Sequence, residues 1–173
     1  MTFRFTPLRA LAALAITSLL TVGLPAAAQT QPAPATPPAY GAPISLEQAK
    51  KAMVAAEAEA RKNNWQVVIS IVDTGGHLVM LQRLEAQNAS VDIATGKART
   101  SVNFRRPTKA LEDGLAANGS ALRILAVPGV TQLQDGLPVV VDGKIIGGIG
   151  VSGVMAFQDE QLAKAGADTL MAK

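Results

Sequence analysis

Side chains that can do chemistry are scarce in this sequence. Its 173 residues include no cysteine and a single histidine, His77. Thiolate metal sites, disulfides, cysteine nucleophiles and sites built from several histidines are therefore excluded. His77 follows two glycines in a turn-forming stretch. It can be a polar turn residue, a polar contact in a pocket, or the one axial ligand that a haem or corrinoid metal takes from a protein.

A cluster of basic residues follows His77 in the sequence and could bind anions. Such a cluster is either a solvated helix face or a set of cations that pairs with anionic groups such as haem propionates. Arginine suits the second role because its planar fork can hold a carboxylate through two hydrogen bonds. The cluster consists of Lys97, Arg99, Arg105, Arg106 and Lys109.

Glycines at residues 148–153 match the pattern G-x-G-x-x-G, after an expected strand and before an expected helix. A dinucleotide site also needs a βαβ unit and an acidic residue after the next strand. Only one further helix is expected after Gly153, so this reading fails. Two readings remain open. The glycines let a strand and a helix pack closely, or free backbone N–H groups before the last helix hold a ligand carboxylate or phosphate.

Ser152 lies within this glycine-rich stretch but does not match a hydrolase nucleophile. The surrounding sequence lacks the second glycine of G-x-S-x-G, and the base would have to be His77 on the other expected hairpin. Asp159 and Glu160 lie near the start of the last expected helix, where acids favourably oppose the helix dipole. We assign these two acids no catalytic role.

The N-terminus is typical of a secretory signal peptide. Arg4 and Arg9 precede an uncharged, mostly apolar stretch at residues 10–24, and the small-residue segment 25–28 follows. As a helix, 15 residues would cover roughly 22 Å, short of the roughly 30 Å hydrocarbon core of a membrane. We therefore expect cleavage after Ala28, a periplasmic or secreted protein, and no membrane span after cleavage.

The remaining composition excludes some classes of partner. The whole chain has 16 basic and 13 acidic residues, and loss of Arg4 and Arg9 with the signal peptide reduces the excess to one positive charge. Aromatic residues are only 3% of the chain, so few are available to stack on bases. Nothing in the net charge recruits nucleic acid or anionic lipid.

The order of expected elements defines the fold class. Residues 29–43 are rich in proline and alanine and predict an extended linker, and the folded domain begins at Ile44. Two hairpins, turning at 73–76 and 142–143, predict a single-domain α/β/α sandwich with an antiparallel sheet of four or five strands. The expected helices span 45–62, 90–106, 108–115, 120–125 and 158–171, and the expected strands span 65–72, 77–81, 138–141 and 144–151.

Four segments, in order, resemble the GlcG/HbpS haem-binding family. VVISIVDTGGHLVMLQRLE at 67–85 is similar to its D-x-G-G-H-L hairpin, and DIATGKARTSVNFRRPT at 92–108 to its KA-x-T helix. GLPVVVDGKIIGGIGVSG at 136–153 resembles its glycine-rich second hairpin, and FQDEQLAKAG at 157–166 the segment behind it. The family is related to the C-terminal domain of PduO-type corrinoid adenosyltransferases. The resemblance covers residues 44–173.

The resemblance implies an α/β/α sandwich with five strands, homo-oligomers, and haem as the cofactor, with a sensor or transport protein as a further partner. The sequence departs from the family pattern at 84–87, after the first hairpin, and at 133–136, before the second. Pro138 also matches the family. The resemblance implies six cofactor-binding residues, with His77 as the metal ligand: His77, Arg83, Lys97, Gly136, Ser152 and Gly153. We add Arg99 from the basic cluster, and Thr131 by its position in the variable loop alone.

Three functions remain open at this stage. The first is an exported protein that binds haem, another tetrapyrrole or iron. The second is a protein or enzyme that binds a small hydroxy or keto acid in glycolate-type metabolism. The third is an oligomeric interaction protein without a small ligand. No acid–base pair is identifiable in the sequence, which disfavours an enzyme.

Overall fold

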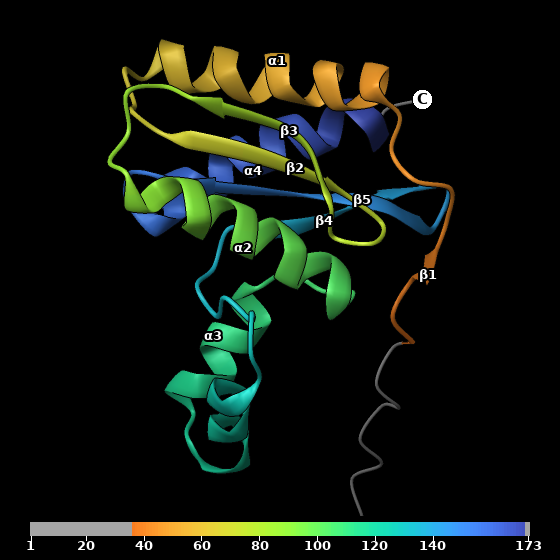
Figure 1. The fold of residues 1–173 in the computed structure, drawn as a ribbon, viewed down its shortest axis with the longest axis vertical. Coiled ribbons are helices and arrows are strands. Elements are labelled where there is room, and N and C mark those ends of the chain that lie inside the picture. The colour runs from red at the N-terminus through yellow and green to blue at the C-terminus, as the bar shows by residue number, and fades with distance from the viewer. Residues whose placement is uncertain (1–35, 172–173) are drawn as a thin grey trace, which may run out of the picture. The chain divides into compact units, whose positions relative to one another are not determined.

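The computed structural model describes residues 36–171, which form a mixed five-stranded sheet between helices (Figure 1). The predicted signal peptide, 1–28, and the first part of the predicted linker lie outside the described residues. The strands are β1 Ala39–Tyr40, β2 Val68–Asp73, β3 Leu78–Arg83, β4 Gly136–Val141 and β5 Lys144–Ser152. The helices are α1 Leu46–Lys62, α2 Ala89–Asn103, α3 Lys109–Ala116, the 3₁₀ helix η1 Gly119–Ala126, and α4 Ala156–Met171.

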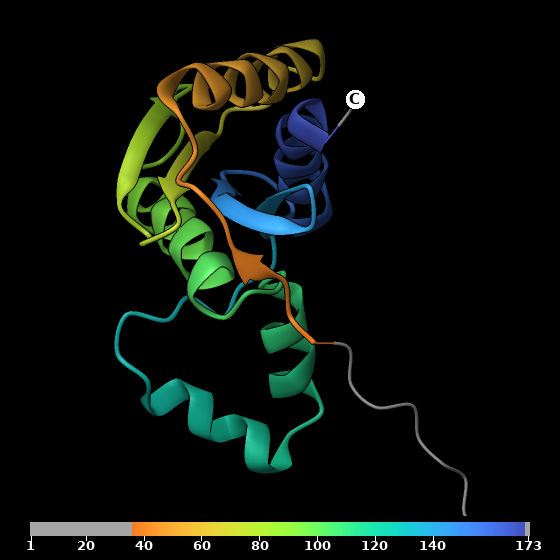
Figure 2. The ribbon, with the colours of Figure 1, turned by 90° about the vertical axis from the view of Figure 1, so that its right-hand side faces the viewer.

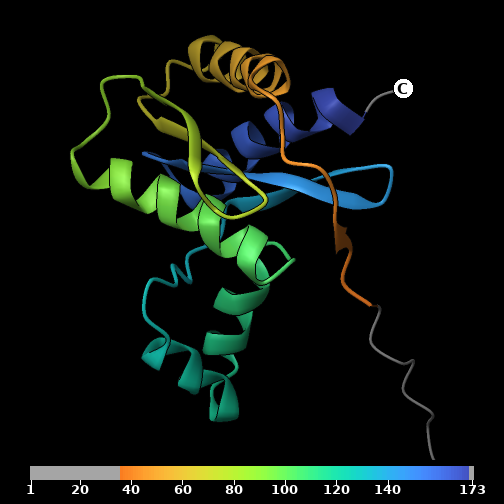
Figure 3. The same cartoon turned by 45° about the vertical axis from the view of Figure 1, so that its right-hand side comes forward.

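The layers are those of an α/β sandwich, as the sequence predicted. Helices α1 and α4 lie side by side on one face of the sheet, and α2 covers the other face (Figure 2). Helix α3 and η1 pack against each other in an arm that stands away from the sheet (Figure 3). Among residues 36–171, no helix is long and apolar enough to cross a bilayer.

The helix starts show where local sequence decides structure. Ser45 and Gln48 form the predicted capping box of α1, in which each side chain accepts a hydrogen bond from the other residue's backbone N–H. The helix expected over 90–106 starts one residue earlier, at Ala89, and ends at Asn103, and Ser90 is buried in its first turn.

The sheet is mixed rather than purely antiparallel. Strand β5 is central, with β4 antiparallel on one edge and β2 antiparallel on the other, and β3 pairs with β2. These four strands come from the two predicted hairpins, which enforce antiparallel pairing. Strand β1 comes from the end of the predicted linker and pairs parallel with the start of β5. Its Tyr40 hydroxyl donates to the carbonyl of Val102 on α2.

Close packing of α2 on β5 explains the glycine motif. A Cβ at Gly150 would strike the carbonyl oxygen of Ala94, and one at Gly148 would lie 2.7 Å from the carbonyl oxygen of Ala98. The glycines therefore let the helix lie directly on the strand backbone, as one of the two readings of the motif predicted. This packing also brings Lys97 of α2 to the C-terminal end of β5.

Candidate functional site

Lys97 is a buried cation that joins three parts of the fold. Its side chain is 5% exposed. The ammonium nitrogen donates to Oδ2 of Asp135, at 2.8 Å, and to the carbonyl oxygen of Val151 at the end of β5, at 2.9 Å. Oδ2 of Asp159 lies 3.8 Å away as a second ion-pair partner. A buried ammonium group is tolerated only when paired in this way.

Asp159 lies in the first turn of α4, and its carboxylate binds backbone amides of the segment before the helix. Its carboxylate accepts hydrogen bonds from the backbone N–H groups of Gly153, at 3.2 Å, and Val154, at 3.3 Å. Burial raises its pKa, and Lys97 and these two amides oppose that shift. The open reading in which free amides before the last helix hold a ligand anion is not supported for Gly153 and Val154, because a carboxylate of the chain itself accepts their N–H groups.

Asp135 lies in the loop before β4 and is almost completely buried, with 1% of its surface exposed. Its Oδ1 has no hydrogen-bond partner in the structure. Burial raises the pKa of this carboxyl to about 6, against the opposing effect of the Lys97 ammonium group. The side-chain amide of Gln134 also acts to lower the pKa of Asp135, but it makes no hydrogen bond with Oδ1 of that carboxyl.

These groups line a small cavity of about 200 Å³ between α2, α4 and the loop before β4. Glu112 of α3 closes it from the arm, where its carboxylate accepts the backbone N–H of Gln134 at 2.9 Å. The lining therefore contains three carboxylates and one ammonium group. A group with a pKa near 6 can take up or release a proton near neutral pH. The polar lining residues are Gln87, Lys97, Glu112, Gln134, Asp135, Ser152 and Asp159.

The structure brings three of the eight predicted site residues together at this cavity, namely Lys97, Ser152 and Gly153. Gly136 follows Asp135 and has a structural role, since its N–H donates to the Thr108 hydroxyl at 2.9 Å and a Cβ would strike the backbone of Lys97. Ser152 is not activated as a nucleophile. Its hydroxyl lies 3.3 Å from that of Ser90.

His77 and Arg99 form a separate group at the turn between β2 and β3. The imidazole is 83% exposed, and its Nδ1 lies 3.4 Å from Oδ1 of Asp73. Nε of Arg99 donates to the carbonyl of Gly76, at 3.1 Å, which fixes the guanidinium beside the turn. Ser152 pairs with Val68 at the other end of β2. His77 is therefore too far from Ser152 to act as its base.

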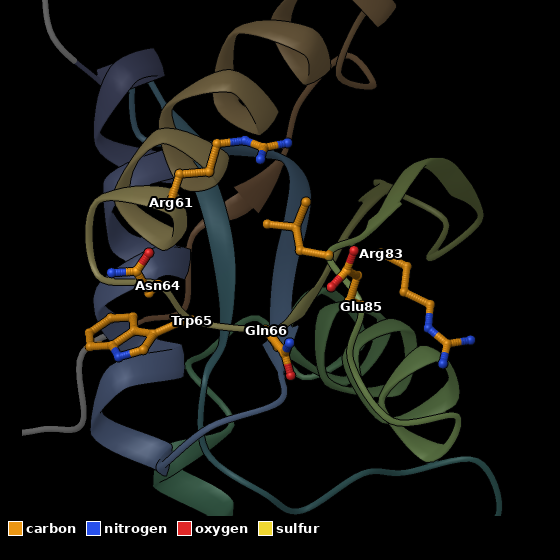
Figure 4. Close-up of a pocket in the computed structure, with 7 residues that line it drawn as sticks. Arg61, Asn64, Trp65, Gln66, Arg83 and Glu85 are labelled. Atoms are coloured by element: carbon orange, nitrogen blue, oxygen red, sulfur yellow. The ribbon is translucent and has the colours of Figure 1, made fainter.

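Arg83 and Thr131 lie apart from both groups. Arg83 donates to the carbonyl of Ala86 and to the side chain of Asn88 at the end of β3, where it borders a cavity of about 510 Å³ (Figure 4). The backbone N–H of Thr131 donates to the Thr100 hydroxyl, and its side chain lies against Gly96 of α2. Neither residue lines the cavity around Lys97.

Sequence reasoning missed Asp135 and Asp159 as site residues. The residue that could have indicated buried acids in the site is Lys97. It lies three residues after Ala94 and four before Ser101, and both of these are buried on the inner face of α2. A lysine on a buried helix face needs a carboxylate partner. In the described part of the chain, no three histidine or acidic side chains are grouped so as to hold a metal ion.

Comparison with known proteins identifies relatives over most of this fold. The family described as "Haem degrading protein HbpS-like" matches residues 44–168. Protein GlcG of Escherichia coli (strain K12) is 42% identical over 110 residues, which cover 63% of this chain and 81% of that protein.

Two solved structures extend the comparison. The crystal structure of HbpS is 35% identical, with a TM-score of 0.70 over 76% of this chain and 93% of its own. A PduOC–haem complex is 28% identical, with a TM-score of 0.67 over 73% of this chain and 94% of its own.

Replacement of Lys97 by methionine should lower the free energy of unfolding by about 3 to 5 kcal/mol, because it leaves buried carboxylates without their cation. Urea denaturation at pH 7 measures this. The matched control is Lys164→Met, which breaks an exposed ion pair with Asp168 and should cost less than about 1 kcal/mol. Equal losses in the two variants would contradict the account of Lys97.

The buried Asp135 should make stability fall as pH rises from about 4 to about 6. Its folded pKa of about 6 lies above the ordinary aspartate pKa of 3.8. In that range the folded state binds more protons than the unfolded state, so rising pH favours unfolding. The free-energy difference between the original protein and Asp135→Asn should therefore decrease by roughly 2 kcal/mol between pH 4 and pH 7. Urea denaturation across this range measures it, and a flat or rising difference would show that the folded pKa is not raised.

Proposed function

The chain belongs to the HbpS-like family, and from that premise we propose that it binds haem, with His77 as the axial ligand of the iron. Two features of the His77 imidazole support its assignment as the ligand, namely its exposure and the carboxylate beside it. The ring is exposed at a rigid turn, and a carboxylate lies beside one of its two nitrogens. The PduOC–haem complex shows that a relative of this fold binds haem.

The turn holds the imidazole in a suitable arrangement. Oδ1 of Asp73 accepts the backbone N–H groups of Gly75, at 2.8 Å, and His77, at 2.9 Å, and also lies near Nδ1 of the ring. A carboxylate beside Nδ1 favours the tautomer in which Nε2 is the ligand. Within residues 36–171, no side chain forms a hydrogen bond with Nε2, so that nitrogen is free to bind a metal.

Neighbouring side chains fit the rest of a haem group. The Arg99 guanidinium beside the turn can pair with a propionate, because only its Nε is bound by a protein group among the described residues. Leu78, which follows His77, is 53% exposed and offers an apolar contact to the porphyrin. The residues present thus fit an open contact on one face of haem, in which they would hold the iron, one propionate and part of the ring.

We further propose that the chain forms homo-oligomers through the arm of α3 and η1. Neither helix buries a single residue within the chain. Leu122, Leu125 and Val127 are exposed on the arm, beside a mainly apolar cavity of about 610 Å³. Apolar surface of this kind on a small domain marks an interaction site.

Export is the remaining part of the proposal. It rests on the predicted signal peptide at residues 1–28, which would place the protein in the periplasm or outside the cell. A partner that senses or transports haem would fit such a location. The small hydroxy or keto acid alternative loses its main support, because Asp159 occupies the amides that were expected to bind the acid.

Titration of the purified protein with hemin should give a saturable Soret shift. Replacement of His77 by alanine should abolish that shift, because it removes the axial nitrogen. Absorbance spectroscopy measures both. Lys144→Ala, at the turn of the other hairpin, is the matched control and should bind hemin as the original protein does. A flat titration would contradict haem binding, and a shift that survives in His77→Ala would contradict the choice of ligand.

An aspartate at position 125 should dissociate the oligomer, because burial of an unpaired charge in an apolar contact is unfavourable. Light scattering after size exclusion should give a multiple of the chain mass for the original protein and the mass of one chain for Leu125→Asp. Val54→Asp is the control, since Val54 is 66% exposed on α1, away from the arm. A monomeric original protein, or an unchanged mass for Leu125→Asp, would rule out the arm as the interface.

A further inference from the structure

The cavity beside Lys97 contains a feature that neither packing nor haem binding explains. Oδ1 of Asp135 is buried without a hydrogen-bond partner, and Asp135 lines the cavity. Leaving a buried polar atom unsatisfied costs about 1 to 3 kcal/mol, and more for a charged group. Such atoms in a folded protein therefore need an explanation, and a donor brought in from outside the chain is one.

The chain holds Asp135 in place from both sides. The N–H of the preceding Gln134 donates to Glu112 at 2.9 Å, and the N–H of the following Gly136 donates to Thr108 at 2.9 Å. Asp135 itself has a φ of 87°, which is unfavourable for a residue with a side chain. Strain of this kind persists where the surroundings fix the backbone, and it concentrates at ligand sites.

Charge decides which ligands the cavity can accept. Glu112, Asp135 and Asp159 contribute three carboxylates, and Lys97 contributes the one cation of the lining. The Lys97 ammonium group already donates to Asp135 and to the carbonyl of Val151. A ligand carboxylate would thus enter a site with excess negative charge, in which the Lys97 ammonium group is already hydrogen-bonded to the chain. A neutral hydroxyl group, by contrast, can donate to Oδ1 at a lower cost of desolvation.

Size restricts the ligand further. A volume of about 200 Å³ equals roughly six or seven water molecules at about 30 Å³ each. The cavity therefore has room for a molecule of a few carbon atoms. The cavity also shares no lining residue with the turn that carries His77 and Arg99.

We infer that this cavity binds a small polyol or other uncharged hydroxyl compound, with one ligand hydroxyl donating to Oδ1 of Asp135. The site is independent of the proposed haem contact, and neither proposal requires the other. Lys97 acts as a positioning residue, because it holds Oδ2 of the same carboxylate and thereby directs Oδ1 at the ligand.

The test compares glycerol with glycerate, which share a carbon skeleton but differ in charge. Both are titrated into the ¹⁵N-labelled protein at pH 7.5, and the amide signals of Gly153, Val154 and Gln134 report binding at the cavity. Glycerol should give saturable shifts at these signals and bind at least roughly tenfold more tightly than glycerate, a difference of about 1.4 kcal/mol. Tighter binding of glycerate, or no saturable shift with either compound, would overturn the inference.

Asp135→Asn tests whether an acceptor oxygen at the position of Oδ1 sets the preference for glycerol. Asparagine fits a positive φ, so this variant should fold, as circular dichroism can verify. Its carbonyl oxygen must face the Lys97 ammonium group, which turns the amide NH₂ toward the cavity and replaces an acceptor by a donor. The preference for glycerol over glycerate should then fall at least roughly tenfold.

Asp168→Asn is the matched control for charge. It removes the same charge from an exposed position on α4, nine residues from Asp159 and so roughly 13 Å along the helix axis. Its ratio of glycerol to glycerate affinity should equal that of the original protein. If both variants shift the ratio equally, net charge rather than Oδ1 of Asp135 sets the preference, and the inference fails.

Discussion

The ammonium group of Lys97 is the one interaction on which the arrangement of the cavity depends. It donates hydrogen bonds to Asp135, in the loop before β4, and to Val151, at the end of β5. It also forms an ion pair with Asp159 of α4. These contacts are possible because glycines of β5 let α2 lie directly on the strand. A buried charge cannot release one partner without a large cost, so the helix, the loop and the start of α4 are positioned together.

The register of β2 separates this cavity from the proposed haem contact. Val68 of β2 pairs with Ser152 at the cavity end, and Asp73 pairs with Gly147 near the turn that carries His77. Five residues of strand at about 3.4 Å each place the two ends roughly 17 Å apart. One end presents an exposed imidazole, whereas the other carries the cavity lined by Lys97 and three carboxylates. The same sheet can therefore support a surface contact for a large ligand at one end and a small cavity at the other.

Local features could be predicted from the sequence, and contacts distant in the sequence could not. The two hairpins and the capping box at Ser45 and Gln48 depend on neighbouring residues, and both are confirmed. Strand β1 was missed because two residues carry no alternation pattern. The carboxylate partner of Lys97 lies 38 residues away, so nothing local identified it. Resemblance named Lys97, Ser152 and Gly153 individually but did not indicate that they share a cavity with Asp135.

A crystal structure of the protein in which ordered solvent is resolved would test the central claim most directly. The account predicts a water or ligand oxygen within hydrogen-bond distance of Oδ1 of Asp135, about 2.5 to 3.0 Å, with Lys97 still bound to Oδ2. A structure in which Oδ1 instead accepts a hydrogen bond from a group of the chain itself, with the cavity closed, would contradict it. In that case the buried carboxylate would serve the packing of α2 alone.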